Sequence, residues 1–63
     1  MRKKLITARS IAGFTQKNVA KRVGISERYY RYIESGRREG RASIWDSLED
    51  LFSVPQRELR ENI

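Results

Sequence analysis

The chain has 63 residues, contains neither cysteine nor histidine, and carries 14 Lys and Arg against 8 Asp and Glu, a net charge of +6. A chain of this length is predicted to form one domain, residues 1–63, with a small core. Disulfide bonds, the common zinc sites and the usual nucleophile–base pairs are all excluded by this composition. We therefore expect no enzymatic activity, no metal, no cofactor and no small-molecule ligand.

The positive charge is concentrated in the first two thirds of the chain. Residues 1–41 hold twelve Lys and Arg against three Glu, whereas residues 42–63 hold two Arg against five acidic residues. A basic segment of this kind is typical of polyanion binders, although a merely soluble basic protein would show it too. Arg2-Lys3-Lys4 precedes only a short apolar run, and no stretch approaches a membrane span. We expect a cytoplasmic protein with no membrane partner.

Residues 3–12 are predicted to form the first helix, which Gly13 ends. Its apolar positions recur at helical spacing and are expected to face the core: Leu5, Ala8, Ile11 and Ala12. Phe14 follows in the link and is expected to fill the core from there.

Residues 15–36 predict two short helices around a tight corner. Thr15 is a suitable N-cap for a helix at 16–23, and Gly24 follows the last apolar residue of that helix. Ser26 can cap a second helix at 27–35, which Gly36 closes. Two helices joined by so short a turn must cross at a large angle.

The helix at 27–35 is predicted to have two different faces. At about 100° per residue, Tyr30 and Ile33 point towards the core. The opposite face carries arginine, tyrosine and serine, with Glu27 at its edge: Arg28, Arg31, Tyr32 and Ser35. Such a face matches the width and the chemistry of the major groove of DNA.

The last third of the chain predicts a loop and two more helices. Residues 37–41 form the loop by composition. A helix at 43–52 has a wide apolar stripe and ends at Ser53-Val54-Pro55, and a fifth helix runs from Pro55 to about Asn62 with Leu59 facing inward. Five short helices with short links predict a compact all-α bundle.

Residues 15–36 resemble the helix-turn-helix of the lambdoid repressor and Cro family, also called the Xre family. The resemblance is carried by Gln16, Ala20, Gly24-Ile25, Ile33, Glu34 and Gly36, and it extends more weakly over nearly the whole chain. It implies a five-helix, lambda-repressor-like domain whose third helix reads DNA. Arg9 lies where the family keeps an arginine that pairs with the glutamate matching Glu34, which implies a structural ion pair rather than a surface arginine.

The resemblance implies four candidates for reading bases: Glu27, Arg28, Arg31 and Tyr32. Arg28 is the strongest, because arginine can donate two hydrogen bonds to guanine in the major groove. Glu27 can accept a hydrogen bond from cytosine, but it can equally serve to stabilise the helix N-terminus. Tyr32 is expected to contact a thymine methyl group or a phosphate. Arg31 is expected to contact either a base or the DNA backbone.

The candidates for contacts with the DNA backbone are Gln16, Lys17, Asn18, Ser35, Arg37, Arg38 and Arg41. A glutamine at the position of Gln16 contacts a phosphate in the family and braces the recognition helix. The arginines of the loop would add affinity without sequence information. Two residues depart from the family: Gly40 replaces a usual proline, and Tyr30 replaces a smaller aliphatic residue. The Tyr30 hydroxyl requires either a rearranged core or a route to the surface.

The resemblance therefore implies a sequence-specific, double-stranded DNA-binding transcriptional regulator of a bacterium or phage, associated with the nucleoid and most simply a repressor. It is expected to bind a palindromic operator as a homodimer formed through the C-terminal third: Leu51, Val54, Leu59 and Ile63. Two alternatives remain open. One is a protein-interaction module of the same fold, resembling an antitoxin or anti-repressor, that uses Tyr29, Tyr30 and Tyr32. The other is a non-specific nucleic-acid binder.

Overall fold

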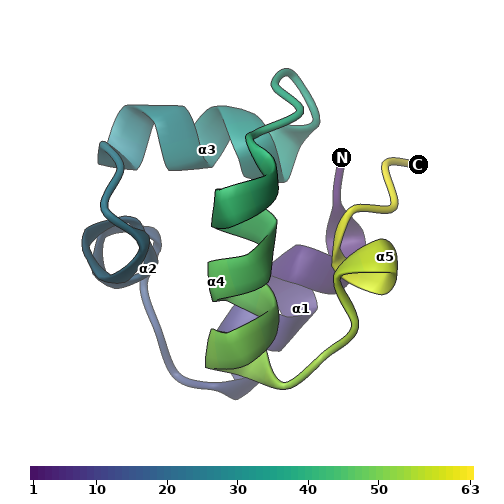
Figure 1. Cartoon of the computed structure of the whole chain (residues 1–63), viewed down its shortest axis with the longest axis horizontal. Helices are drawn as coiled ribbons and strands as arrows, with labels where there is room; N and C mark the ends of the chain where they lie inside the picture. The colour runs from purple at the N-terminus through teal and green to yellow at the C-terminus, as the bar shows by residue number, and fades with distance from the viewer.

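The computed structural model describes all residues 1–63 and contains five helices and no strand (Figure 1). The helices are α1 (Lys3–Ile11), α2 (Gln16–Val23), α3 (Glu27–Ser35), α4 (Ala42–Phe52) and α5 (Gln56–Leu59). The prediction of an all-α, five-helix bundle is confirmed. Helices α2 and α3 have the predicted bounds, and those of α1 and α4 differ from prediction by one residue.

The corner between α2 and α3 is built by local signals. The Thr15 side chain accepts a hydrogen bond from the Asn18 amide at 3.1 Å, and the Asn18 side chain accepts one from the Thr15 amide at 3.3 Å, which completes a capping box. Ser26 Oγ likewise accepts from the Tyr29 amide at 3.1 Å. Gly24, at φ 78°, ends α2 in the left-handed conformation that favours glycine.

The core lies inside the bundle of five helices. Each helix contributes at least one buried residue to it. Figure 1 shows α4 running from top to bottom through the middle of the molecule, with α3 along its upper end, α2 to its left, α1 behind it and α5 to its right beside α1. Nine apolar residues are buried: Leu5, Val19, Ala20, Tyr30, Ile33, Ile44, Trp45, Leu48 and Leu59. Phe14 is half-buried and packs against this cluster, with its ring 6.3 Å from that of Phe52.

Two core predictions for α1 are wrong. Ile11 is 82% exposed, and Ala12 lies exposed just beyond the helix. The reason is Arg9, which turns inward to meet Glu34. Ile11 follows Arg9 by two residues, so at about 100° per residue it points to nearly the opposite side.

The prediction for the fifth helix is also wrong in length. Helix α5 ends at Leu59, and Pro55 precedes it in an extended conformation. Asn62 and Ile63 leave the helix because they bond elsewhere: the Asn62 side chain donates to the Gly36 carbonyl at 3.2 Å, and the Ile63 amide donates to the Met1 carbonyl at 3.2 Å. The two ends of the chain consequently lie side by side (Figure 1).

Leu59 is fully buried, which confirms the prediction that it faces inward. The prediction that it contributes to a contact between two copies is therefore wrong. Leu51 and Val54 are half-buried against the core, and Ile63 is 83% exposed. Leu59 faces inward because α5 packs against both α1 and α4, which leaves its apolar side no route to solvent.

Candidate nucleic-acid interface

The outer face of α3 carries polar and charged side chains, most of them exposed. Figure 1 shows α3 along the upper edge, with the other helices on its inner side. Tyr30, Ile33 and Glu34 are buried beneath it. Arg28, Arg31 and Ser35 are exposed on the outside, whereas Glu27 and Tyr32 are half-buried at its margins. A row of arginine donors on a free helix face can reach base edges in a groove.

A chain of hydrogen bonds links this face to the interior. Arg31 Nη2 contacts Glu27 Oε2 at 2.7 Å, and Arg31 Nε donates to Gln16 Oε1 at 3.2 Å. Gln16 Nε2 in turn donates to Glu34 Oε1 at 2.9 Å. The amide of Gln16 is therefore oriented from both sides, and Arg31 is held at the junction of α2 and α3. Arg28 is much less restrained, since its side chain makes one hydrogen bond, from Nε to the Tyr32 hydroxyl at 3.4 Å.

The loop at 37–41 lies beside the outer face of α3. Arg37, Arg38 and Arg41 are exposed, and the Arg37 guanidinium lies 5.9 Å from the centre of the Tyr32 ring. Between the loop and α3 is an open groove of about 480 Å³. Its lining contains three arginines and one acid: Ser26, Arg28, Tyr29, Tyr32, Arg38, Glu39, Gly40 and Arg41. This groove has the charge and the hydrogen-bond donors that suit a phosphodiester backbone.

The N-terminus of α2 borders α3 on the side away from the loop, where Gln16 is bonded to Arg31 and Glu34. Gln16 is half-buried there, and Lys17 and Asn18 are exposed. The side chain of Asn18 is engaged in the capping box, so it is a poorer candidate for a phosphate contact than Lys17.

Arg9 and Glu34 form an ion pair beneath α3. Arg9 Nε lies 2.6 Å from Glu34 Oε2, and the two side chains are 17% and 3% exposed. Arg9 Nη1 also donates to the Phe14 carbonyl at 3.0 Å. The hydrogen bond to Glu34 raises the pKa of Arg9. The pair ties α1 to the end of α3, and through Gln16 it also fixes the start of α2.

A family model described as a helix-turn-helix domain matches residues 4–62. The chain belongs to this helix-turn-helix family. No curated protein and no solved structure matches the chain. Membership indicates DNA binding, with α2 and α3 as the helices of the motif. None of the helices of this helix-turn-helix domain is long and apolar enough to cross a membrane.

Tyr30 is the unusual residue in the core of the helix-turn-helix domain. It is fully buried, and its hydroxyl has no hydrogen-bond partner of normal geometry. Burial raises the pKa of Tyr30, and the neighbouring Glu34 carboxylate adds to this. Of the two alternatives for the Tyr30 hydroxyl, the route to the surface is wrong. Tyr29 is half-buried and packs against the core, so Tyr32 alone of the three tyrosines extends the outer face.

Arg2 is 1% exposed, although no feature of the sequence predicts its burial. Arg2 is followed by Lys3 and Lys4, and nothing in this local sequence distinguishes it from an ordinary surface arginine. Its burial follows from partners at residues 33, 38, 39 and 60, which only the folded chain brings together.

Proposed function

We propose that this helix-turn-helix domain is a sequence-specific, double-stranded DNA-binding transcriptional repressor of the Xre type. Helix α3 would lie in the major groove. The observation that carries the proposal is the position of the arginine-bearing face of α3. The basic loop at 37–41 lies along one side of this face, and the N-terminus of α2 lies along the opposite side. This arrangement suits a reading helix between two groups of phosphate contacts.

The base-reading roles fall to Arg28, Arg31, Glu27 and Tyr32. Arg28 is the main reader, because its side chain is exposed and only weakly held, and it can turn towards guanine. Arg31 is already fixed between Glu27 and Gln16, so it presents its guanidinium in one orientation. Glu27 then serves mainly to hold Arg31, and Tyr32 supports Arg28.

The backbone roles fall to residues on both sides of α3. Arg37, Arg38 and Arg41 would bind one strand along the groove beside the loop, and Ser35 would add a hydroxyl near the same end. Gln16 and Lys17 would meet phosphates at the start of α2, where the helix dipole favours negative charge. Asn18 contributes by maintaining that helix end.

Two copies of the domain would occupy a palindromic operator as a homodimer. Half-sites one DNA turn apart have centres about 34–36 Å apart, and the largest extent of the domain is only 24 Å. Because this spacing exceeds the extent of the domain, contact between copies would be limited to side chains at their facing edges. The apolar area there would come from the exposed Ile63 and the half-buried Leu51 and Val54 of the C-terminal third. A stable interface buries about 800 Å² per partner, roughly a fifth of the 4195 Å² that the domain exposes. We expect the pair to form on DNA and to separate without it.

The decisive experiment is selection from a pool of random duplexes at physiological salt. Enrichment of a palindromic motif supports the proposal. Binding that is equal on all sequences and falls steeply with salt indicates a non-specific nucleic-acid binder instead. Absence of binding to any duplex leaves the protein-interaction module, which the burial of Tyr30 already weakens. Sedimentation of the free protein and of its operator complex tests the assembly, and a monomer in both would refute it.

A further inference from the structure

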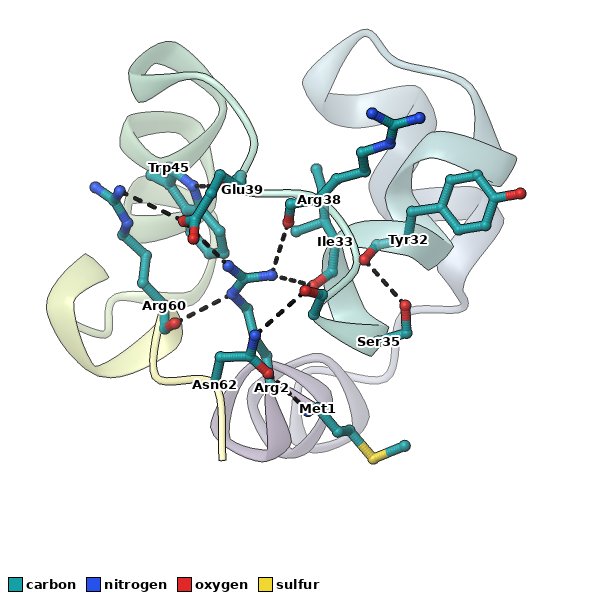
Figure 2. A network of polar contacts seen from close by, with 11 residues as sticks. Met1, Arg2, Tyr32, Ile33, Ser35, Arg38, Glu39, Trp45, Arg60 and Asn62 are labelled. Carbon is teal, nitrogen blue, oxygen red and sulfur yellow. Dashed lines mark hydrogen bonds and ion pairs between the residues drawn. The ribbon is translucent and has the colours of Figure 1, made fainter.

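The environment of Arg2 links the start of the chain to the proposed DNA-binding surface. Its main-chain amide donates to the Glu34 carbonyl at 2.8 Å, near the end of α3. Its side chain then passes beneath the loop at 37–41 and is 1% exposed. Figure 2 shows the guanidinium at the centre of a polar network between α3, the loop and the C-terminal segment.

Every nitrogen of this guanidinium has a partner. Nη1 donates to the Ile33 carbonyl at 2.6 Å and to the Arg38 carbonyl at 2.8 Å. Nε donates to the Arg60 carbonyl at 3.1 Å, and Nη2 contacts the Glu39 carboxylate at 3.3 Å. Ile33 lies in the last turn of α3, where carbonyls lack helical partners and the helix dipole favours a cation. Burial lowers the pKa of Arg2, while Glu39 opposes that change.

The same network fixes the main chain of the loop. Arg2 holds the Arg38 carbonyl, and Trp45 Nε1 donates to the next carbonyl, that of Glu39, at 2.7 Å. The amides of Arg37 and Arg38 donate to the Tyr32 carbonyl at 2.9 and 3.2 Å. Consecutive residues of the loop are thus tied to α3, to α4 and to Arg2, while their arginine side chains remain exposed.

We propose that Arg2 is a positioning residue for the phosphate-binding loop. It does not contact DNA itself, because its charge is enclosed. It sets the direction in which the main chain leaves α3, and so holds Arg37, Arg38 and Arg41 beside the groove before DNA arrives. A loop that is already ordered loses less conformational freedom on binding. The proposal rests on the proposed DNA-binding function.

A lysine is not an adequate substitute for Arg2. The acceptors lie on different sides of the guanidinium, and a planar fork with five donors reaches them together. A lysine keeps the charge but concentrates its donors at one atom. The Arg2→Lys variant therefore separates positioning from charge, since it would behave like the wild type if Arg2 supplied only positive charge.

The first test does not involve DNA. Amide hydrogen exchange and ¹H–¹⁵N spectra of wild type, Arg2→Lys and Arg2→Met are compared at residues 37–41 and at the Trp45 indole. We expect faster exchange and shifted resonances there in both variants, with the Val19 amide of α2 unchanged. Arg2→Lys keeps the charge and the main-chain hydrogen bond, and it is the deciding variant if Arg2→Met does not fold. Wild-type exchange and resonances of the loop in a folded variant would overturn the proposal.

The second test measures affinity for a selected duplex and for unrelated duplexes across a salt series. We expect Arg2→Lys to weaken binding to all of them by the same factor, about 3- to 10-fold, with the slope of log affinity against log salt lower by about one. Leu59→Ala controls for stability and is measured at a temperature at which it is folded to the same fraction as Arg2→Lys. Lys4→Met controls for the loss of a positive charge in α1, the helix that follows Arg2. A loss confined to the selected duplex, or an equal loss in Leu59→Ala, would overturn the proposal. Failure of the wild type to bind any duplex would refute the proposed function, while the exchange experiment still decides whether Arg2 orders the loop.

Discussion

Replacing Arg9 by Met tests the ion pair that joins α1 to the end of α3. The substitution removes the 2.6 Å contact to Glu34 and leaves a carboxylate that is 3% exposed with one remaining donor, Gln16 Nε2 at 2.9 Å. Methionine retains much of the aliphatic stem, so the lost interaction is mainly electrostatic.

The expected loss of stability follows from the burial of the pair. Removing one partner of a buried pair costs about 3–5 kcal/mol. The lower limit applies here, because Arg9 is 17% exposed and Gln16 still donates a hydrogen bond to the Glu34 carboxylate that has lost its partner. A domain of 63 residues has a free energy of unfolding of about 3–9 kcal/mol. The variant should therefore lose a third or more of its stability, and its Tm should fall by at least about 12 °C.

The assay is urea and thermal unfolding followed by Trp45 fluorescence and circular dichroism. Lys4→Met is the matched control, because Lys4 pairs with Glu61 at 3.1 Å but the two side chains are 52% and 42% exposed. That exposed pair should contribute less than about 1 kcal/mol. The double variant Arg9→Met/Glu34→Leu should recover more than half of the loss, since no charge is left buried. A loss in Arg9→Met no larger than in Lys4→Met would refute the reasoning.

The remaining predictions concern the core tyrosine, the reading face and the cap of α2. Tyr30→Phe should leave Tm unchanged or raise it, because it removes a buried hydroxyl without a partner; a loss above about 1 kcal/mol would show that the hydroxyl is bonded in solution. Burial raises the pKa of Tyr30, so the unfolded chain releases the tyrosine proton at a lower pH than the folded chain. Above about pH 10 the free energy of unfolding of the wild type should therefore fall faster than that of Tyr30→Phe, by up to about 1.4 kcal/mol per pH unit. Parallel curves of unfolding free energy against pH from about pH 9 to 11 would contradict this. Arg28→Ala should cost about 1–3 kcal/mol on a selected site and relax its preference, whereas Arg37→Ala should weaken all duplexes alike; equal profiles in a binding competition would count against the division of roles. Thr15→Ala should cost about 1 kcal/mol in urea unfolding through loss of the capping box, and an effect below a few tenths would mean that the Asn18 side chain alone maintains this end.

The bounds of α2 and α3 could be predicted because their determinants are local. Thr15 and Ser26 satisfy amides three residues ahead, and Gly24 and Gly36 adopt positive φ values that end each helix. The division of α3 into a buried and an exposed face follows from helical periodicity in the same way. These features depend on neighbours within one or two turns, which the order of residues specifies directly.

Three features depend on residues far apart along the chain: the burial of Arg2, the exposure of Ile11 and the length of α5. Arg2 resembles Lys3 and Lys4 until the Ile33, Arg38 and Arg60 carbonyls surround it, and no periodicity records that meeting. The sequence alone therefore determined where the central helices begin and end and which side of α3 stays free. Only the tertiary structure decided which charges are enclosed and what holds the loop beside α3, because the contacts that compensate a buried charge are made across the fold.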